Sequence, residues 1–213
     1  MRWVAVLLVS LAGIGFVNAP AMAHPHVWVD TRLTILFDKG SMSGLKQVWS
    51  FDEAYTEMAI EGLDVNNDGV YDRGELAELA KVNMEGLEEF EYFSFVRLAG
   101  VRLKLGKPSD SYLEYSKDKG LTLHFTVPFE QPVLAEAAGF SVSVYDPSYF
   151  IAFNMAKDDP VRLGEGAPAG CEPVLAAPKG DAEEVARLGE AFAVTLGPEV
   201  GITLAREITL RCP

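Results

Sequence analysis

Residues 26–37, His-Val-Trp-Val-Asp-Thr-Arg-Leu-Thr-Ile-Leu-Phe, alternate apolar and polar side chains over most of their length. Successive side chains of a β-strand point to opposite faces, so this period of two predicts a strand with one buried face. Gly40 and Gly44 then bracket a turn, and residues 45–51 continue as the second strand of a hairpin. We therefore expect the fold to begin with an antiparallel pair of strands.

Further runs with strand character follow, separated by turn residues such as those at 99–100, 119–120 and 146–147. They are residues 92–98, 101–105, 111–115, 121–128, 140–145, 149–155 and 202–210. A loop rich in Pro, Gly and Ala is expected at 164–180, and an amphipathic helix at 181–196. The predicted fold class is α+β: a mainly antiparallel β-sheet domain with an inserted EF-hand-like helix-loop-helix and one C-terminal amphipathic helix.

Residues 64–75, Asp-Val-Asn-Asn-Asp-Gly-Val-Tyr-Asp-Arg-Gly-Glu, match the calcium loop of an EF-hand at every ligand position. Gly69 stands at position six, where the chain has to turn sharply. Helical spacing on both sides predicts a helix–loop–helix at 51–88. The expected Ca²⁺ ligands are Asp64, Asn66, Asp68, the backbone carbonyl of Val70, Asp72 and Glu75. An acidic surface turn, which Asn, Asp and Gly also favour, is the alternative.

The chain contains one such loop and no second hand to pair with it. Calcium sensors use paired hands, whereas a single loop in an exported protein suits a structural site that fills at extracellular calcium concentrations. We therefore interpret the loop as a structural element.

The first 23 residues have the features of a secretory signal peptide. Arg2 precedes an apolar run at 4–17, and Ala21-Met-Ala23 supplies a small-residue cleavage site. Cleavage there leaves residues 24–213 as a single domain in the periplasm, and no later segment is apolar enough to span a bilayer. Residues 19–21, Ala-Pro-Ala, form a competing cleavage site.

The formal net charge of −13 argues against partners that are themselves polyanions, such as nucleic acid and anionic membrane surfaces. The chain has two cysteines, Cys171 and Cys212. In an oxidising compartment such a pair most simply forms one disulfide. Two free thiols or a soft-metal pair is the alternative.

Two of the three histidines, His24 and His26, lie at the predicted mature terminus. A terminal histidine can chelate a metal through its α-amine and its ring, and both groups lose their protons readily near neutral pH. Pro25 has no backbone N–H, which excludes the copper and nickel motif that needs a deprotonated amide there. His124 shares the less apolar face of its strand, so His24, His26 and His124 are the candidate ligands for a transition metal.

Two less specific interpretations remain open. Terminal residues are often disordered, and a lone histidine in a strand is usually hydrogen-bonded or exposed. Asp146 and the Asp52-Glu53 pair are candidate carboxylate partners, but a turn-forming role and a helix-start role explain them equally simply.

Several stretches of the chain resemble a family of bacterial exported proteins of unknown function, described as the periplasmic component of an uncharacterised ABC-type transport system. The matching stretches are residues 24–30, 49–55, 63–76, 92–96, 121–127, 144–150 and 170–171. The resemblance implies an accessory protein for a nickel, cobalt or zinc permease of the inner membrane. It also implies that the three histidines bind the transition metal and that the loop binds calcium. Asn66-Asn67 stands where a more acidic pair is expected, which lowers the charge of the loop.

The leading hypothesis is a periplasmic metal-binding accessory protein for Zn²⁺, Ni²⁺ or Co²⁺ uptake with a structural Ca²⁺ site. The second is a calcium-stabilised interaction module that binds no transition metal. A third, an oxidative enzyme with a copper bound at the terminal histidine, ranks below both because no nucleophile–base constellation is present. We therefore do not expect an enzyme.

Overall fold

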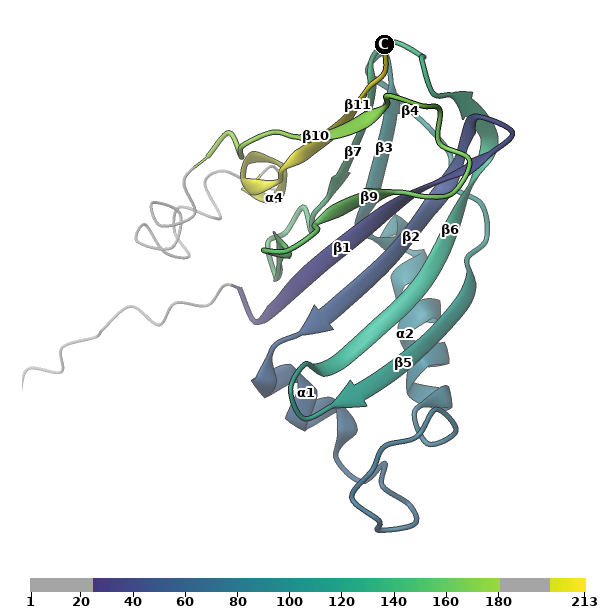
Figure 1. The fold of residues 1–213 in the computed structure, drawn as a ribbon. Helices are drawn as coiled ribbons and strands as arrows, with labels where there is room; N and C mark the ends of the chain where they lie inside the picture. Colours follow the sequence, from purple (N-terminus) through teal and green to yellow (C-terminus); the bar gives the residue numbers. More distant parts are fainter. Residues whose placement is uncertain (1–24, 181–199) are drawn as a thin grey trace, which may run out of the picture.

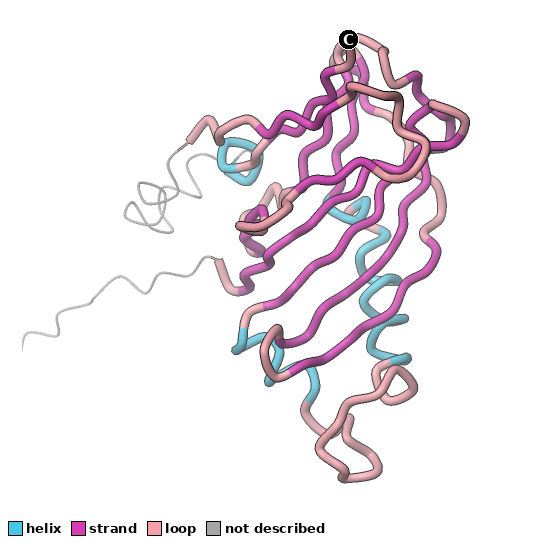
Figure 2. The backbone as a smooth tube through the Cα atoms, in the orientation of Figure 1, coloured by secondary structure: helices cyan, strands magenta, loops and turns pink. Residues whose placement is uncertain are grey.

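The computed structural model describes residues 25–180 and 200–213, which form two β-sheets and a helical insertion (Figures 1 and 2). The elements in chain order are β1 (Val27–Asp38), β2 (Ser41–Phe51), α1 (Glu53–Ile60), α2 (Ala77–Glu88), the 3₁₀ turn η1 (Glu91–Phe93), β3 (Ser94–Leu98), β4 (Val101–Arg102), β5 (Ser109–Ser116), β6 (Gly120–Leu134), β7 (Phe140–Val144), β8 (Ile151–Met155), β9 (Val161–Leu163), β10 (Glu172–Leu175), α4 (Val200–Leu204) and β11 (Glu207–Arg211). This β-rich composition agrees with the α+β class predicted from the sequence.

The β1–β2 hairpin forms as its period of two predicts. The alternate residues Val29, Leu33 and Ile35 are almost fully buried, and the side chains between them are more exposed. The turn is tighter than expected, because Lys39 and Gly40 connect the strands with φ of 49° and 81°. Two successive positive φ values give the twist that a two-residue hairpin loop needs. The predicted second strand at 45–51 therefore starts earlier, at residue 41.

Sheet A has six strands in the order β5-β6-β2-β1-β8, and β9 also pairs with β1. The β1–β2, β2–β6 and β5–β6 pairs are antiparallel, as predicted. In contrast, β8 and β9 pair with β1 in parallel. Sheet A is therefore mixed, because the chain returns to the free edge of β1 in the same direction as β1 itself.

Sheet B has five strands in the order β10-β11-β7-β3-β4, all paired antiparallel. In Figure 1 its β3 and β7 strands lie behind β1 and β2, and α2 lies behind β5 and β6. The same face of sheet A is thus covered by sheet B at one end and by α2 at the other. Among the described residues, neither sheet B nor α2 covers the opposite face of sheet A, which we call its open face (Figure 1).

Three predicted strands differ in detail. Residues 92–93 belong to the turn η1, where Tyr92 has a φ of 55°, and residues 202–204 belong to α4 before β11 begins. The strand predicted at 101–105 is shortened to the two residues of β4. The segment 164–180, expected to be a loop, contains β10, which pairs with β11. The predicted amphipathic helix at 181–196 lies outside the described residues. The helices on both sides of the loop are present, and both lie within the predicted range 51–88.

A buried side-chain amide connects the two sheets. The Oε1 atom of Gln47 on β2 accepts hydrogen bonds from Trp49 Nε1 at 3.2 Å and from Thr31 Oγ1 at 3.4 Å. Its Nε2 atom donates to Ser94 Oγ of β3 at 2.8 Å, and Ser94 Oγ donates to the Tyr92 carbonyl at 2.8 Å. Gln47 has no exposed surface, so both ends of its amide depend on these protein partners.

Cys171 and Cys212 form a disulfide across a sequence separation of 41 residues. The bond connects the segment just before β10 to the end of the chain just after β11, and β10 and β11 pair with each other. The predicted pairing is confirmed. Such a bond favours a compartment outside the cytoplasm. Among the described residues no helix is long and apolar enough to cross a membrane.

We predict that Gln47→Ala lowers the free energy of unfolding by about 3 kcal/mol, because it leaves Trp49 Nε1 without a partner in the core and removes the only donor to Ser94 Oγ among the described hydrogen bonds. Thr31→Val is the matched control, since it removes only the long 3.4 Å contact to the same amide and should cost about 1 kcal/mol or less. Urea unfolding of the two variants measures the difference. Equal losses would show that the amide does not connect the sheets.

Candidate functional site

The loop between α1 and α2 extends from one end of the molecule (Figure 1). Its acidic and amide oxygens accept hydrogen bonds from backbone N–H groups of the same loop. Asp64 accepts from Asp68 N at 3.1 Å and from Gly69 N at 3.0 Å. Asn66 Oδ1 accepts from Asp68 N at 2.8 Å, and Asp68 Oδ1 accepts from Val70 N at 2.7 Å. The first half of the loop is therefore curled around its own side chains.

Glu75, at the last ligand position, closes the loop on its beginning. Its Oε1 atom accepts from Val65 N at 3.0 Å and its Oε2 atom from Asp72 N at 3.2 Å. Asp72 Oδ1 in turn accepts from the N–H groups of Gly74 and Glu75, at 2.7 and 3.0 Å. Both carboxylates thereby lie near the start of α2.

Gly69 has a φ of 77°, and a Cβ atom there would meet nothing within 4 Å. The turn therefore requires glycine for its backbone conformation, as predicted, and not for space. Leu76, one of the two leucines that bracket the loop, is 1% exposed, and Leu63 packs against the core from the other side. The loop is anchored at both ends.

The donor set fits calcium in type and number, because it offers oxygens alone and the closing position is a glutamate. The residues are Asp64, Asn66, Asp68, Val70, Asp72 and Glu75. Within residues 25–180 and 200–213, however, no three side chains of His, Cys, Asp or Glu are placed to hold one metal ion together. Calcium would have to draw the carboxylates from the loop N–H groups onto the ion.

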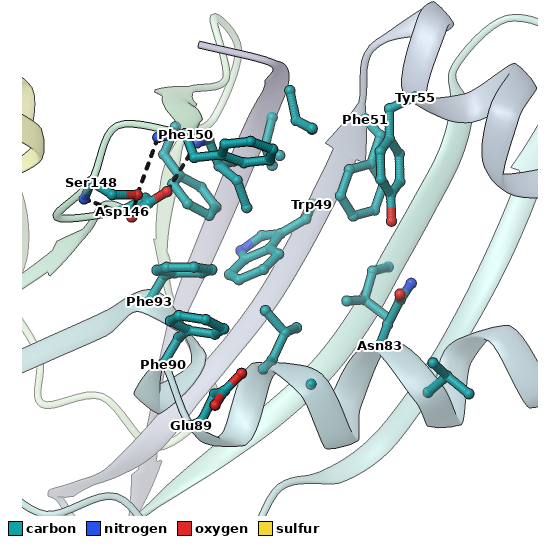
Figure 3. Close-up of a pocket in the computed structure, with 18 residues that line it drawn as sticks. Trp49, Phe51, Tyr55, Asn83, Glu89, Phe90, Phe93, Asp146, Ser148 and Phe150 are labelled. Atoms are coloured by element: carbon teal, nitrogen blue, oxygen red, sulfur yellow. Dashed lines mark hydrogen bonds between the residues drawn. The ribbon is translucent and has the colours of Figure 1, made fainter. Parts of the chain in front are cut away.

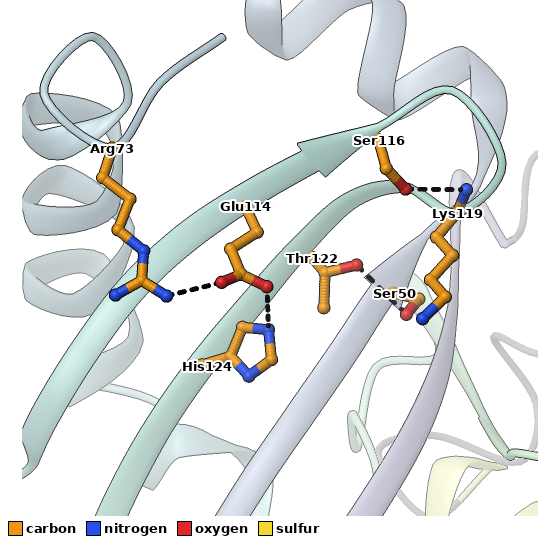
Figure 4. A network of polar contacts seen from close by, with 7 residues as sticks. All are labelled: Ser50, Arg73, Glu114, Ser116, Lys119, Thr122 and His124. Carbon is orange, nitrogen blue, oxygen red and sulfur yellow. Dashed lines mark hydrogen bonds and ion pairs between the residues drawn. The ribbon is translucent and has the colours of Figure 1, made fainter.

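His124 lies on β6 and is 15% exposed. Its ring stacks on Tyr112 of β5 with centroids 4.5 Å apart, and its Nε2 atom lies 3.4 Å from Glu114 Oε2. The two atoms are close enough for an ion pair, but their geometry is not that of a hydrogen bond. Arg73, which belongs to the loop at 64–75, reaches the same group (Figure 4): it binds Glu114 Oε1 at 2.5 Å and covers the Tyr112 ring at 3.9 Å. The loop and the open face of sheet A therefore share one cluster.

The electrostatics of this cluster favour a neutral imidazole. Burial is the largest influence and lowers the pKa of His124, and the nearby Lys46 and Arg73 lower it further. Glu114 acts in the opposite direction but does not outweigh burial. The hydrogen bond from Arg73 is the main cause that lowers the pKa of Glu114 itself. A neutral imidazole is the form that binds metals.

The other two histidines are placed differently. His24 lies outside the described residues. The backbone N–H of His26 donates to the Phe150 carbonyl at 2.9 Å, and the two rings lie 4.7 Å apart. His26 is therefore held at the start of β1, next to the segment that leads into β8.

The structure does not bring His26 and His124 together. Val48 of β2 lies opposite Arg32 of β1 on one side and opposite His124 of β6 on the other. Since His26 precedes Arg32 by six residues, the two histidines are separated by about 20 Å along the strand direction. They cannot bind one ion in this arrangement.

The carboxylates considered as additional ligands have structural partners. Asp52 caps α1 by accepting from Tyr55 N at 2.9 Å, and it also accepts from Trp28 N at 2.7 Å. Asp146 is 6% exposed and accepts from Ser148 N, Ser148 Oγ and Ile151 N. The simpler interpretations, a helix start and a turn, therefore describe both residues.

The partners of His124 were not predicted from the sequence. Glu114 and Tyr112 stand at alternate positions of β5, which places them on one face. That this face meets His124 depends on the β5–β6 register, which the sequence does not reveal. Arg73 occupies a loop position that carries no calcium ligand, so the loop motif gives it no role.

The fold and the loop together define a β-rich α+β protein with an inserted helix–loop–helix. The chain belongs to the family described as "Protein of unknown function (DUF1007)", whose model matches residues 9–212. It is similar to an uncharacterised protein of Haemophilus influenzae, with 23% identity over 205 residues that cover 92% of this chain and 95% of that protein. It is also similar to an uncharacterised 15.5 kDa protein in the trpE 3' region of Spirochaeta aurantia, with 29% identity over 100 residues that cover 47% of this chain and 70% of that protein.

We predict that His124 makes the protein less stable as the pH falls below about 6.5. Folding lowers the pKa of His124, so below this pH the unfolded chain binds a proton that the folded chain does not. The free energy of unfolding then falls by at most about 1.4 kcal/mol per pH unit. Urea unfolding at pH 7.5 and 5.5 should show a smaller loss for His124→Gln than for the wild type. The contribution of Glu114 does not interfere, since its lowered pKa makes it matter only below about 4.5.

Thr126→Ala, two residues further along β6, is the control and should keep the wild-type pH dependence. An identical loss of stability in the wild type and in His124→Gln would contradict the prediction.

Proposed function

We propose that this protein is an exported, calcium-stabilised metal-binding protein that assists an inner-membrane permease in the uptake of zinc, nickel or cobalt. The observation that carries the proposal is the loop between α1 and α2, in which every ligand position of a calcium loop has an oxygen donor. Export to the periplasm is supported by the predicted signal peptide at 1–23 and by the Cys171–Cys212 disulfide.

Calcium has a structural role in this proposal. The ligands are Asp64, Asn66, Asp68, Val70, Asp72 and Glu75. When the ion draws these groups together, it fixes the start of α2 and the position of Arg73, which pairs with Glu114 on sheet A. The Arg73 and Glu114 side chains are 62% and 47% exposed, so water and salt screen the pair and it adds little to stability by itself. The gain in stability therefore comes from the ion and its ligands.

The transition metal belongs at the predicted mature terminus. His24 would supply an α-amine and an imidazole, and His26 a second imidazole, which are suitable donors for zinc, nickel and cobalt. His124 is left out of this site because the register of sheet A separates it from His26. A site at a chain end has few fixed ligands, and this favours transfer of the metal to a partner over permanent storage.

We predict that 10 mM Ca²⁺ raises the melting temperature of the mature protein by about 5–10 °C, which corresponds to about 2.7 kcal/mol for a site of 0.1 mM affinity. Glu75→Gln should remove most of this shift, because it replaces the bidentate carboxylate. Glu78→Gln is the matched control: this glutamate lies on α2 with a 78% exposed side chain and pairs only loosely with Lys81 at 3.6 Å. An equal calcium response in the two variants would refute the loop site.

We predict that the mature protein binds one transition-metal ion at neutral pH and that His24→Ala weakens binding at least tenfold, since it removes one of the two imidazoles from the chelate. An extra residue in front of His24 should have a similar effect because it removes the α-amine from the chelate. Titration calorimetry with Zn²⁺, Ni²⁺ and Co²⁺ measures both. His124→Ala is the control and should bind as the wild type does.

The same titrations decide between this proposal and a calcium-stabilised interaction module. Loss of binding in His124→Ala but not in His24→Ala would move the site to the cluster with Glu114. No binding of any of the three metals, with the calcium response intact, would favour the interaction module.

A further inference from the structure

An apolar cavity of about 520 Å³ lies between sheet A and α2 (Figure 3). This volume is in the range of sites that hold small organic ligands. Seven aromatic side chains line the cavity: Trp49, Phe51, Tyr55, Phe90, Phe93, Phe150 and Phe153. The cavity is separate from the calcium loop and from the cluster around His124, so the inference does not rest on the proposed metal function.

The aromatic rings are held in place by one another, which keeps the cavity from collapsing. Phe51 stacks on Tyr55 at 4.5 Å on one side, and Phe90 stacks on Phe93 at 5.2 Å on the other (Figure 3). Trp49 lies between the two pairs and is 1% exposed. The wall is therefore preformed on β2, α1 and η1.

The opening of the cavity exposes large apolar groups. Phe90 and Phe150 are 51% and 46% exposed, and Val82 of α2 is 54% exposed. Scattered apolar side chains on a surface need no explanation, but apolar side chains around the opening of an apolar cavity indicate a binding site.

One polar group in the wall is unsatisfied. The Nδ2 atom of Asn83 on α2 is buried and has no hydrogen-bond partner. Burial raises the pKa of the neighbouring Tyr55 phenol, and the Asn83 amide opposes this only in part, since the two side chains do not meet in hydrogen-bond geometry. A buried donor without a partner costs free energy that a ligand acceptor could recover. The cavity therefore favours a ligand with an oxygen acceptor.

The charge around the cavity disfavours anions. Among the described residues, Asp146 and Glu89 are the acidic ones in its wall and none in the wall is basic. The whole chain has a net charge of −13. The Asp146 carboxylate already accepts hydrogen bonds from Ser148 and Ile151, so it supplies negative charge while its oxygen atoms are engaged within the protein. A carboxylate or sulfonate ligand would be repelled.

We propose that this cavity is a binding site for a small aromatic molecule without negative charge, which gives a carbonyl or ether oxygen to Asn83 Nδ2 as hydrogen-bond acceptor. The stacked rings select an aromatic body and the acidic rim excludes anions. The buried amide orients the ligand within the cavity.

The test uses the fluorescent ketone 6-propionyl-2-dimethylaminonaphthalene and its parent 2-dimethylaminonaphthalene, which lacks the ketone oxygen. The full mature protein should bind the ketone, with a blue shift and an increase of its emission. The parent compound should bind about five- to tenfold more weakly, because it leaves Asn83 unpaired. Asn83→Leu should reduce this preference to nearly one without loss of the fold, as checked by circular dichroism.

Gly86→Leu tests the location of the site. Gly86 of α2 lines the cavity, and a Cβ atom there meets nothing within 4 Å, so a leucine can enter the open space without a clash. Its helical position also tolerates leucine better than glycine. We expect at least a tenfold loss of ketone binding. Ala77→Leu is the matched control, because it adds the same side chain at an exposed position of α2 outside the cavity.

Each result supports or overturns the proposal. The proposal is supported if Gly86→Leu weakens ketone binding while Ala77→Leu does not, and if Asn83→Leu removes the preference for the ketone over the parent compound. Equal binding in Gly86→Leu and Ala77→Leu would place the probe elsewhere, and an unchanged ketone preference in Asn83→Leu would refute the role of the amide. Failure of the wild type to bind either naphthalene would exclude a small-molecule site of this class.

Discussion

The hydrogen bonds of one buried amide connect the two sheets. Gln47 reaches from β2 to Ser94 at the start of β3 while its other end holds the Trp49 indole. Trp49 is also the central ring of the apolar cavity, with Phe125 and Phe153 packed edge-on against it at 4.9 Å. The amide therefore fixes the distance between the sheets and the orientation of the ring on which the cavity is built. A polar group in the core is costly unless fully paired, and here the pairing selects one arrangement.

The parts of the fold that sequence could predict are those determined by near neighbours. The alternation along residues 27–37 is a local pattern, and β1 lies there. The ligand spacing at 64–75 is also local, and this segment lies between α1 and α2. Gln47, in contrast, occupies a position in an alternating strand that an apolar residue would fill, and only Ser94, 47 residues away, explains it. The parallel pairing of β8 and β9 with β1 depends on where the chain returns, and no local pattern encodes that.

The candidate sites divide in the same way. The oxygen donors of the loop are contiguous, so their spacing could be predicted before the structure. The histidines are far apart in sequence, and only the strand register reveals that His26 and His124 belong to different parts of sheet A. The cluster of Arg73, Glu114 and His124 combines residues from the loop, β5 and β6. Because these segments are separate in the sequence, no single motif contains all three residues. A loop motif and a sheet position become one polar network only after folding.

The parallel edge of sheet A has a consequence for the order of folding. One edge of β1 is occupied at once by its hairpin partner β2, but the other waits for β8 and β9, which end at residue 163. Until more than a hundred further residues are available, that edge presents open backbone donors and acceptors on which another chain could dock. Contacts of such long range form slowly. The nascent chain therefore passes through a stage at which one edge of its first strand is open to pairing with another chain.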